Sequence, residues 1–143
     1  MSKSPPHLYV DSNIYLNIWY KEDKNYQSSY NLLNEIINCR YTLTSSMLVI
    51  KELSKKTGIP QNDIMNDYMK PYQILNKFNM VKITQNVADD AVYVASQHGI
   101  HATDALHVIM AKLNNCILVT RDREMTRVAT QYGVKVSTPE SLT

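Results

Sequence analysis

Short apolar runs alternate along the whole chain with longer segments in which apolar residues recur at helical spacing. Five runs have the length and composition of β-strands: His7–Val10, Tyr41–Thr44, Met80–Ile83, Ile117–Thr120 and Val134–Val136. The longer segments predict helices: Ile14–Trp19, Tyr26–Asn38, Met47–Thr57, Val87–His98, Asp104–Asn114 and Arg123–Tyr132. This alternation predicts an α/β fold, a three-layer α/β/α sandwich around a mainly parallel sheet.

Several helical segments carry finer expectations. The segment from Pro60 to Leu75 is expected to form one helix with a kink at Pro71. Ser45-Ser46 is expected to cap the helix Met47–Thr57. The segment Asp104–Asn114 is apolar on nearly every side, which predicts a central, buried helix. The apolar face expected for Val87–His98 consists of Ala88, Ala91, Val92 and Ala95.

Length and composition are those of an ordinary globular chain. With 143 residues, of which 44% are hydrophobic and 20% charged, a single domain over residues 1–143 is expected. No apolar run reaches the roughly 18 residues of a membrane span, and the N-terminus lacks the apolar stretch of a secretory signal. Cys39 and Cys116 show no zinc-finger spacing and are expected to be buried, reduced thiols, so the expected location is cytoplasmic.

Acidic residues stand where predicted strands end or helices begin. Asp11 follows the first strand, Asp122 follows the fourth, and Asp104 lies in the first turn of the apolar helix. Because ligands of parallel α/β sheets bind beyond the carboxyl ends of the strands, these carboxylates are expected at one edge of the sheet. Glu52 lies on the apolar side of its helix, where an unpaired carboxylate is costly.

Each of these acids has an ordinary structural explanation when taken alone. Asp11 is explained by helix capping, Asp104 by the helix macrodipole and Asp122 by a turn, and Glu52 by a salt bridge. Together, however, four clustered carboxylates raise each other's pKa unless a cation lies among them. An all-oxygen ligand set favours Mg²⁺ or Mn²⁺ over zinc.

The order of four short motifs resembles the PIN domain family, best known from the VapC toxins of toxin–antitoxin pairs. The motifs are DSN at Asp11–Asn13, a mid-chain helical Glu52, TDALH at Thr103–His107 and LVTRD at Leu118–Asp122. The resemblance covers essentially the whole chain. It implies a compact α/β/α nuclease fold.

The resemblance also implies roles for single residues. It assigns catalysis and metal binding to four acids: Asp11, Glu52, Asp104 and Asp122. Asn13 and Thr120 match polar residues that orient those acids, and Glu124 matches the position of an auxiliary ligand. The implied chemistry is hydrolysis of RNA phosphodiester bonds with one or two divalent ions. A stand-alone domain of this size further implies an antitoxin partner and a homodimer, with Tyr26–Ile37 and Ile64–Leu75 as the candidate surfaces for either contact.

Basic residues border the proposed acidic site. Setting the four proposed ligands aside leaves nine of the 13 acids against 15 lysines and arginines. The residues expected to contact the RNA backbone are Lys51, Lys55, Arg121 and Arg123. A solvated helix face explains any single one of them equally well.

Other functions fit the sequence less well. His98, His101 and His107 suggest zinc, but Gly99 interrupts them and no cysteine or HExxH pattern assists, so structural roles are favoured. For His107, packing or a hydrogen bond to a neighbouring element is expected. Dinucleotide binding needs a glycine-rich first turn, which is absent. A non-catalytic PIN-like module that binds RNA or protein and an RNA-processing housekeeping nuclease remain as alternatives, and the complete set of four acids favours an enzyme.

Overall fold

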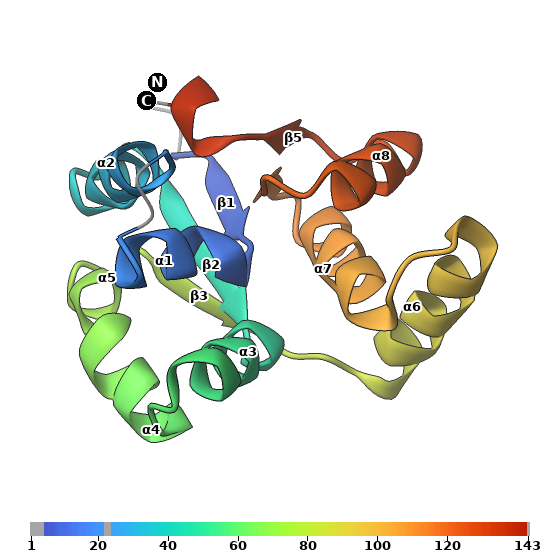
Figure 1. Cartoon of the computed structure of the whole chain (residues 1–143), viewed down its shortest axis with the longest axis horizontal. Coiled ribbons are helices and arrows are strands. Elements are labelled where there is room, and N and C mark those ends of the chain that lie inside the picture. The colour runs from blue at the N-terminus through green and yellow to red at the C-terminus, as the bar shows by residue number, and fades with distance from the viewer. Residues whose placement is uncertain (1–4, 22–23, 143) are drawn as a thin grey trace.

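Five parallel strands form a single sheet at the centre of the molecule (Figure 1). The computed structural model describes residues 5–21 and 24–142. The sheet order is β3-β2-β1-β4-β5. The strands are β1 (His7–Val10), β2 (Thr42–Ser46), β3 (Phe78–Val81), β4 (Ile117–Val119) and β5 (Val136–Ser137). The sheet and its helices confirm the predicted α/β/α sandwich.

Helices cover the sheet from both sides (Figure 1). One face is covered by the helices of the N-terminal half of the chain. These are α1 (Ser12–Trp19), α2 (Tyr26–Ile37), α3 (Met47–Thr57), α4 (Gln61–Asp63), the π-helix η1 (Ile64–Tyr68) and α5 (Lys70–Ile74). The second group is α6 (Gln85–His98), α7 (Ala102–Leu113) and α8 (Arg123–Gln131), and the short 3₁₀ helix η2 (Pro139–Ser141) follows β5. Within the described ranges, none of these helices has the length and apolar character needed to traverse a bilayer.

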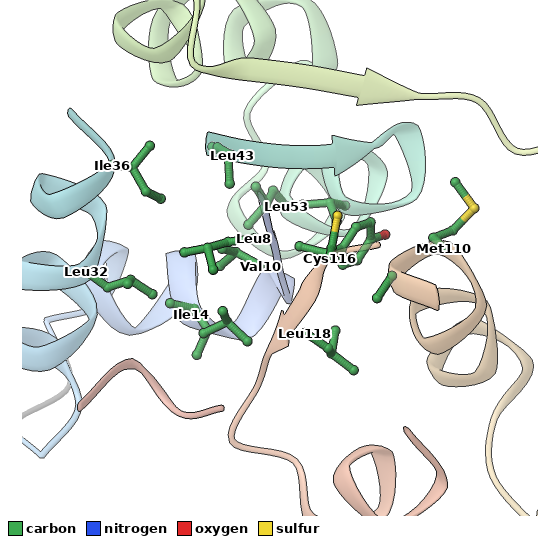
Figure 2. Close-up of a cluster of buried hydrophobic side chains, with 14 of the residues drawn as sticks. Leu8, Val10, Ile14, Leu32, Ile36, Leu43, Leu53, Met110, Cys116 and Leu118 are labelled. Atoms are coloured by element: carbon green, nitrogen blue, oxygen red, sulfur yellow. The ribbon is translucent and has the colours of Figure 1, made fainter. Parts of the chain in front are cut away.

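The core joins both helical layers to the sheet. Figure 2 shows Leu32 of α2 and Met110 of α7 on opposite sides of the strands, with Leu8 and Leu118 between them. All four side chains are buried. A smaller apolar cluster holds α6, α7 and α8 together. The strand ends are therefore fixed by packing on both faces.

The bounds of β1 are as predicted, and the ends of the other four strands differ by at most two residues from those that composition predicts. β2 extends to Ser46, and β3 begins at Phe78, because these strands pair along Leu43↔Phe78 to Ser46↔Val81. β5 is confined to Val136–Ser137, which are the residues that pair with β4. Hydrogen bonding to the neighbouring strand, rather than apolar character, decides where each strand begins and ends.

The single kinked helix predicted from Pro60 is wrong, because the segment is divided into α4, η1 and α5. The N–H of Met69 donates to the carbonyl of Ile64 at 3.1 Å, a five-residue spacing that widens the turn. Pro71, which has no N–H, then lies in the first turn of α5. The extra residue shifts the helical phase, so Met69 is buried while Tyr68 and Leu75 are exposed.

Three burial predictions are also wrong. Val92 is 61% exposed, because α6 turns Ala91, Val94 and Ala95 toward α7 and α8 instead. Leu113, at the end of α7, is exposed, although residues 104–111 of that helix are all buried or half-buried, as expected for a central helix. Cys39 lies on the surface in a left-handed turn after α2, whereas Cys116 is buried as expected.

The order in which the chain adds strands to the sheet reverses between β1 and β4. From β1 the chain continues into α1 on one side of the sheet, and from β4 it continues into α8 on the other side. The carboxyl ends of these adjacent parallel strands therefore lie where the strand order reverses, the usual ligand position in open α/β sheets. Asp11 and Thr120 follow these two strands directly.

Candidate metal centre

Asp11 is anchored at the carboxyl end of β1. Its backbone N–H donates to the carbonyl of Val119 at 3.0 Å, which continues the pairing of β1 with β4 by one residue. One carboxylate oxygen, Oδ2, accepts the hydroxyl of Thr120 at 3.0 Å, and Oδ1 accepts the hydroxyl of Ser12 at 3.4 Å. Asp11 is the N-cap residue of α1, and although its side chain forms no capping hydrogen bond of good geometry, the backbone N–H of Asn13 helps to lower its pKa.

The pKa of Asp11 is raised, chiefly because burial disfavours the charged carboxylate. Nearby His107 and the hydrogen bond from Thr120 lower this pKa, while the charge of Glu52 raises it. Asp11 is only 2% exposed. It is thus a buried carboxylate beside a second acid, a combination that a cation would stabilise.

Thr120 links Asp11 to Asp122. Its hydroxyl donates to Asp11 and accepts the backbone N–H of Asp122 at 3.1 Å. Asp122 in turn caps α8 by accepting the N–H of Met125 at 3.0 Å through Oδ1. The ordinary role of Asp122 is therefore that of a helix cap rather than the turn residue expected from the sequence, and this role fixes its carboxylate just beyond the end of β4.

Asp104 lies half-buried in the first turn of α7, as predicted. Burial raises its pKa most, and the charges of Asp122 and Asp11 raise it further. His107 and His101 act in the opposite direction. The repulsion places Asp11, Asp104 and Asp122 in one acidic cluster, drawn from the ends of β1 and β4 and the start of α7.

Glu52 is paired with a histidine rather than with a lysine or arginine. Its Oε1 lies 2.8 Å from Nε2 of His107, a side chain that is 1% exposed. Nδ1 of His107 lies 2.8 Å from the hydroxyl of Tyr9. The hydrogen bond expected for His107 is therefore present. The spacing of three between Asp104 and His107 turns both side chains to one face of α7, which indicates that His107 faces the acids but not which partner it has.

Two residues predicted to assist the acids are less closely associated with them. Asn13 is exposed in the first turn of α1, and its side chain makes no hydrogen bond to the part of the chain that the structure describes. Glu124 forms an exposed ion pair with Arg127 at 2.8 Å. Its charge is not among those that shift the pKa of Asp11 or Asp104. The structure does not bring Glu124 into the acidic cluster.

The four basic residues predicted to contact RNA divide into two kinds. Lys51 and Lys55 are exposed on α3, the helix that carries Glu52, and Arg123 is exposed at the start of α8, directly after Asp122. Arg121 instead binds both carboxylate oxygens of Glu140 at 2.7 Å. It also donates to three polar side chains: Asn17, Ser28 and Ser29. Its guanidinium thus fastens the end of β4 to α1, α2 and η2, and is not free for a phosphate.

The acidic cluster suits a hard divalent cation by its chemistry. Across residues 5–21 and 24–142, no three acidic, histidine or cysteine side chains converge closely enough to count as a formed metal site. The donors are nevertheless all carboxylates, and the pKa values of Asp11 and Asp104 are raised, chiefly by burial and further by neighbouring acids. Oxygen donors of this kind fit Mg²⁺ or Mn²⁺. Zinc fits poorly, since both ring nitrogens of His107 and Nε2 of His98 already have hydrogen-bond partners.

Comparison with known families identifies the family of the chain. A family model described as "PIN domain" matches residues 8–131. The chain belongs to the PIN domain family. The match confirms the resemblance that the sequence motifs suggest. PIN domains are generally nucleases and generally use divalent metals.

Solved PIN-like structures share the fold over nearly their full length. A toxin–antitoxin complex from Klebsiella pneumoniae is 18% identical, with a TM-score of 0.61 over 92% of this chain and 97% of that one. VapBC2 from Rickettsia felis, bound to a promoter DNA fragment, is 19% identical, with a TM-score of 0.62 over 92% and 98%. The PIN domain endonuclease Utp24 is 16% identical, with a TM-score of 0.57 over 95% and 86%. No curated protein matches this chain in a sequence comparison.

Proposed function

We propose that this PIN domain is a divalent-metal-dependent ribonuclease whose active site is the acidic cluster at the ends of β1 and β4. One observation carries the proposal. Asp11 is buried and fixed by Thr120 at the point where the strand order reverses, while the charges of Asp122 and Asp11 raise the pKa of Asp104. Isolated caps and turns do not account for this repulsion on Asp104.

We assign the four acids different roles according to their exposure. Asp11, Asp104 and Asp122 would hold Mg²⁺ or Mn²⁺, with Glu52 completing the set. When bound, the ion supplies positive charge for the scissile phosphate and lowers the pKa of a water molecule. Thr120 keeps the Asp11 carboxylate in one orientation through its 3.0 Å hydrogen bond. Glu52, Asp104 and Asp122 are only partly buried, so one of these three can reach solvent and accept the proton of an attacking water.

The RNA backbone would lie along the exposed basic residues at the rim. Lys51 and Lys55 project from α3, and Arg123 begins α8 beside Asp122. These side chains neutralise phosphates without reading base sequence. With RNA as the substrate, the activity is expected in the cytoplasm.

We further propose that the protein acts as the toxin of a VapBC-type pair. Support comes from the fold, which it shares with the chains of toxin–antitoxin complexes. An apolar groove of about 220 Å³ lies between α1, α3, η1 and α5 and is bordered by the partly exposed rings of Trp19 and Tyr68. This groove suits an apolar segment of an antitoxin. Exposed Tyr30 and Ile37 on α2 offer a separate surface for a homodimer.

The ribonuclease proposal is tested by cleavage of an end-labelled structured RNA. Wild-type protein with Mn²⁺ is expected to cut, and EDTA is expected to stop it. Asp104→Asn should lower the rate by roughly two orders of magnitude or more, because it removes a charged ligand while keeping the shape. Asp90→Asn, at an exposed acid of α6 outside the cluster, is the matched control and should cut like wild type.

Three other results would change the interpretation. Equal cleavage by wild type and Asp104→Asn would identify the activity as a contaminant and refute the mechanism. Binding of RNA by wild type without any cleavage would support a non-catalytic module. A toxin is distinguished from a housekeeping nuclease by whether the adjacent gene encodes a small DNA-binding protein.

A further inference from the structure

A chain of buried polar side chains leads from the middle of the sheet to the acidic cluster. The hydroxyl of Ser46 lies 2.8 Å from that of Tyr9, which lies 2.8 Å from Nδ1 of His107, whose Nε2 lies 2.8 Å from Oε1 of Glu52. Ser46, Tyr9 and His107 are at most 1% exposed. The four residues come from β2, β1, α7 and α3, so the chain connects the two helical layers through the sheet.

The direction of the hydrogen bonds follows from what each group can donate. A carboxylate only accepts, so Nε2 of His107 carries the proton that Glu52 receives. In a neutral imidazole Nδ1 then accepts, and the hydroxyl of Tyr9 donates to it. The oxygen of Tyr9 remains free to accept the hydroxyl of Ser46. Every polar atom between Ser46 and Glu52 is satisfied in this arrangement.

Helix capping and simple packing do not explain these polar side chains. Ser46 precedes α3, yet it makes no capping hydrogen bond and its hydroxyl is directed to Tyr9. Tyr9 has no exposed surface and its ring is tilted against that of His107, with centroids 5.5 Å apart. Because the His107 side chain is buried and both its ring nitrogens are hydrogen-bonded, the imidazole is held in one orientation. The Glu52 side chain, which has several rotatable bonds, is in turn held by this one partner.

We propose that His107 is a positioning residue of the metal centre, which holds the Glu52 carboxylate in place and is itself oriented by Tyr9. The inference rests on the proposed function, because it matters only if Glu52 belongs to a metal site. Partners that orient metal-binding side chains commonly change metal affinity by about 10- to 100-fold when they are removed. A histidine with a merely structural role would change stability but not metal affinity.

The test measures Mn²⁺ binding to the purified full chain by isothermal titration calorimetry, without RNA. His107→Leu removes the donor and should weaken Mn²⁺ binding by about 10- to 100-fold. His107→Gln places an amide N–H near the former Nε2 and should retain affinity within a few-fold of wild type. Both variants are first checked for cooperative unfolding.

Removal of single hydroxyls provides a matched pair. Tyr9→Phe deletes the group that orients His107 and should weaken Mn²⁺ binding several-fold. Tyr15→Phe is the control, because the Tyr15 hydroxyl is also buried but has no hydrogen-bond partner among residues 5–21 and 24–142. Its Mn²⁺ affinity should equal that of wild type.

The possible results separate the two proposals. If wild type and Asp11→Asn both fail to bind Mn²⁺, the metal-dependent function and the role of His107 are both wrong. If wild type binds, Asp11→Asn does not, and folded His107→Leu binds like wild type, only the positioning role is overturned. Should His107→Leu fail to fold, equal affinities of Tyr9→Phe and wild type would overturn it instead.

Discussion

Single residues at the acidic cluster combine an ordinary structural contact with an unusual electrostatic position. Asp122 caps α8, and Asp11 extends the pairing of β1 with β4. Both positions follow from the sequence, because the ends of strands and the starts of helices can be located from periodicity. The pairing of Glu52 with His107 does not follow, since 55 residues separate them and only the packing of α3 and α7 around the sheet brings them together.

The raised pKa of Asp11 predicts the pH dependence of stability in the absence of metal. Because burial raises the folded-state pKa above the unfolded value, the native state binds more protons between these two values. The contribution of Asp11 to stability therefore increases as pH falls from neutral through its folded pKa. Asp11→Asn removes the charge, and its amide oxygen can still accept the Thr120 hydroxyl.

Urea unfolding in EDTA at several pH values measures this effect. We expect Asp11→Asn to be more stable than wild type at neutral pH, with the difference shrinking as the pH falls toward about 4. A variant that is less stable than wild type at neutral pH would show that the buried charge is already compensated.

At the scale of elements, the pattern of apolar residues locates helices and strands. It does not show where a helical turn widens or where each strand ends. The sequence indicates a helical segment after Pro60, yet the five-residue turn at Met69 is invisible in a periodic pattern. The strands extend or contract to match their neighbours, as β2 and β3 do. The role of Arg121 is likewise set by tertiary structure, because its partners lie in α1, α2 and η2.

Arg121 is expected to stabilise the loop between β4 and α8 rather than to bind substrate. Glu140 is about half exposed, so the ion pair alone contributes little. The larger effect of Arg121→Ala is the loss of donors to Asn17, Ser28 and Ser29, for an expected destabilisation of about 1–3 kcal/mol.

Arg123→Ala is the matched control, two residues along and exposed, and should change stability by less than about 0.5 kcal/mol. Urea denaturation of the two variants gives the comparison. Equal stabilities would contradict the structural role of Arg121 and return it to the RNA-binding surface.

At the scale of the whole molecule, sheet order explains why residues so far apart in sequence share one site. The order β3-β2-β1-β4-β5 places the ends of the first and fourth strands side by side, and α7 starts close to them. Strand alternation predicts the layers and the parallel sheet, and the motifs supply the family. The sequence does not show which face each helix covers, and hence does not show the chain of buried polar side chains that ends at Glu52.

The claim that these carboxylates form a metal site is tested most directly by anomalous diffraction from crystals soaked in Mn²⁺. We predict an anomalous peak bonded to a carboxylate oxygen of Asp11 and to Asp104, Asp122 or both. We also predict that crystals of Asp11→Asn lack this peak. A map with no manganese between these side chains, or with manganese only at other surface acids such as Glu124, would contradict the claim.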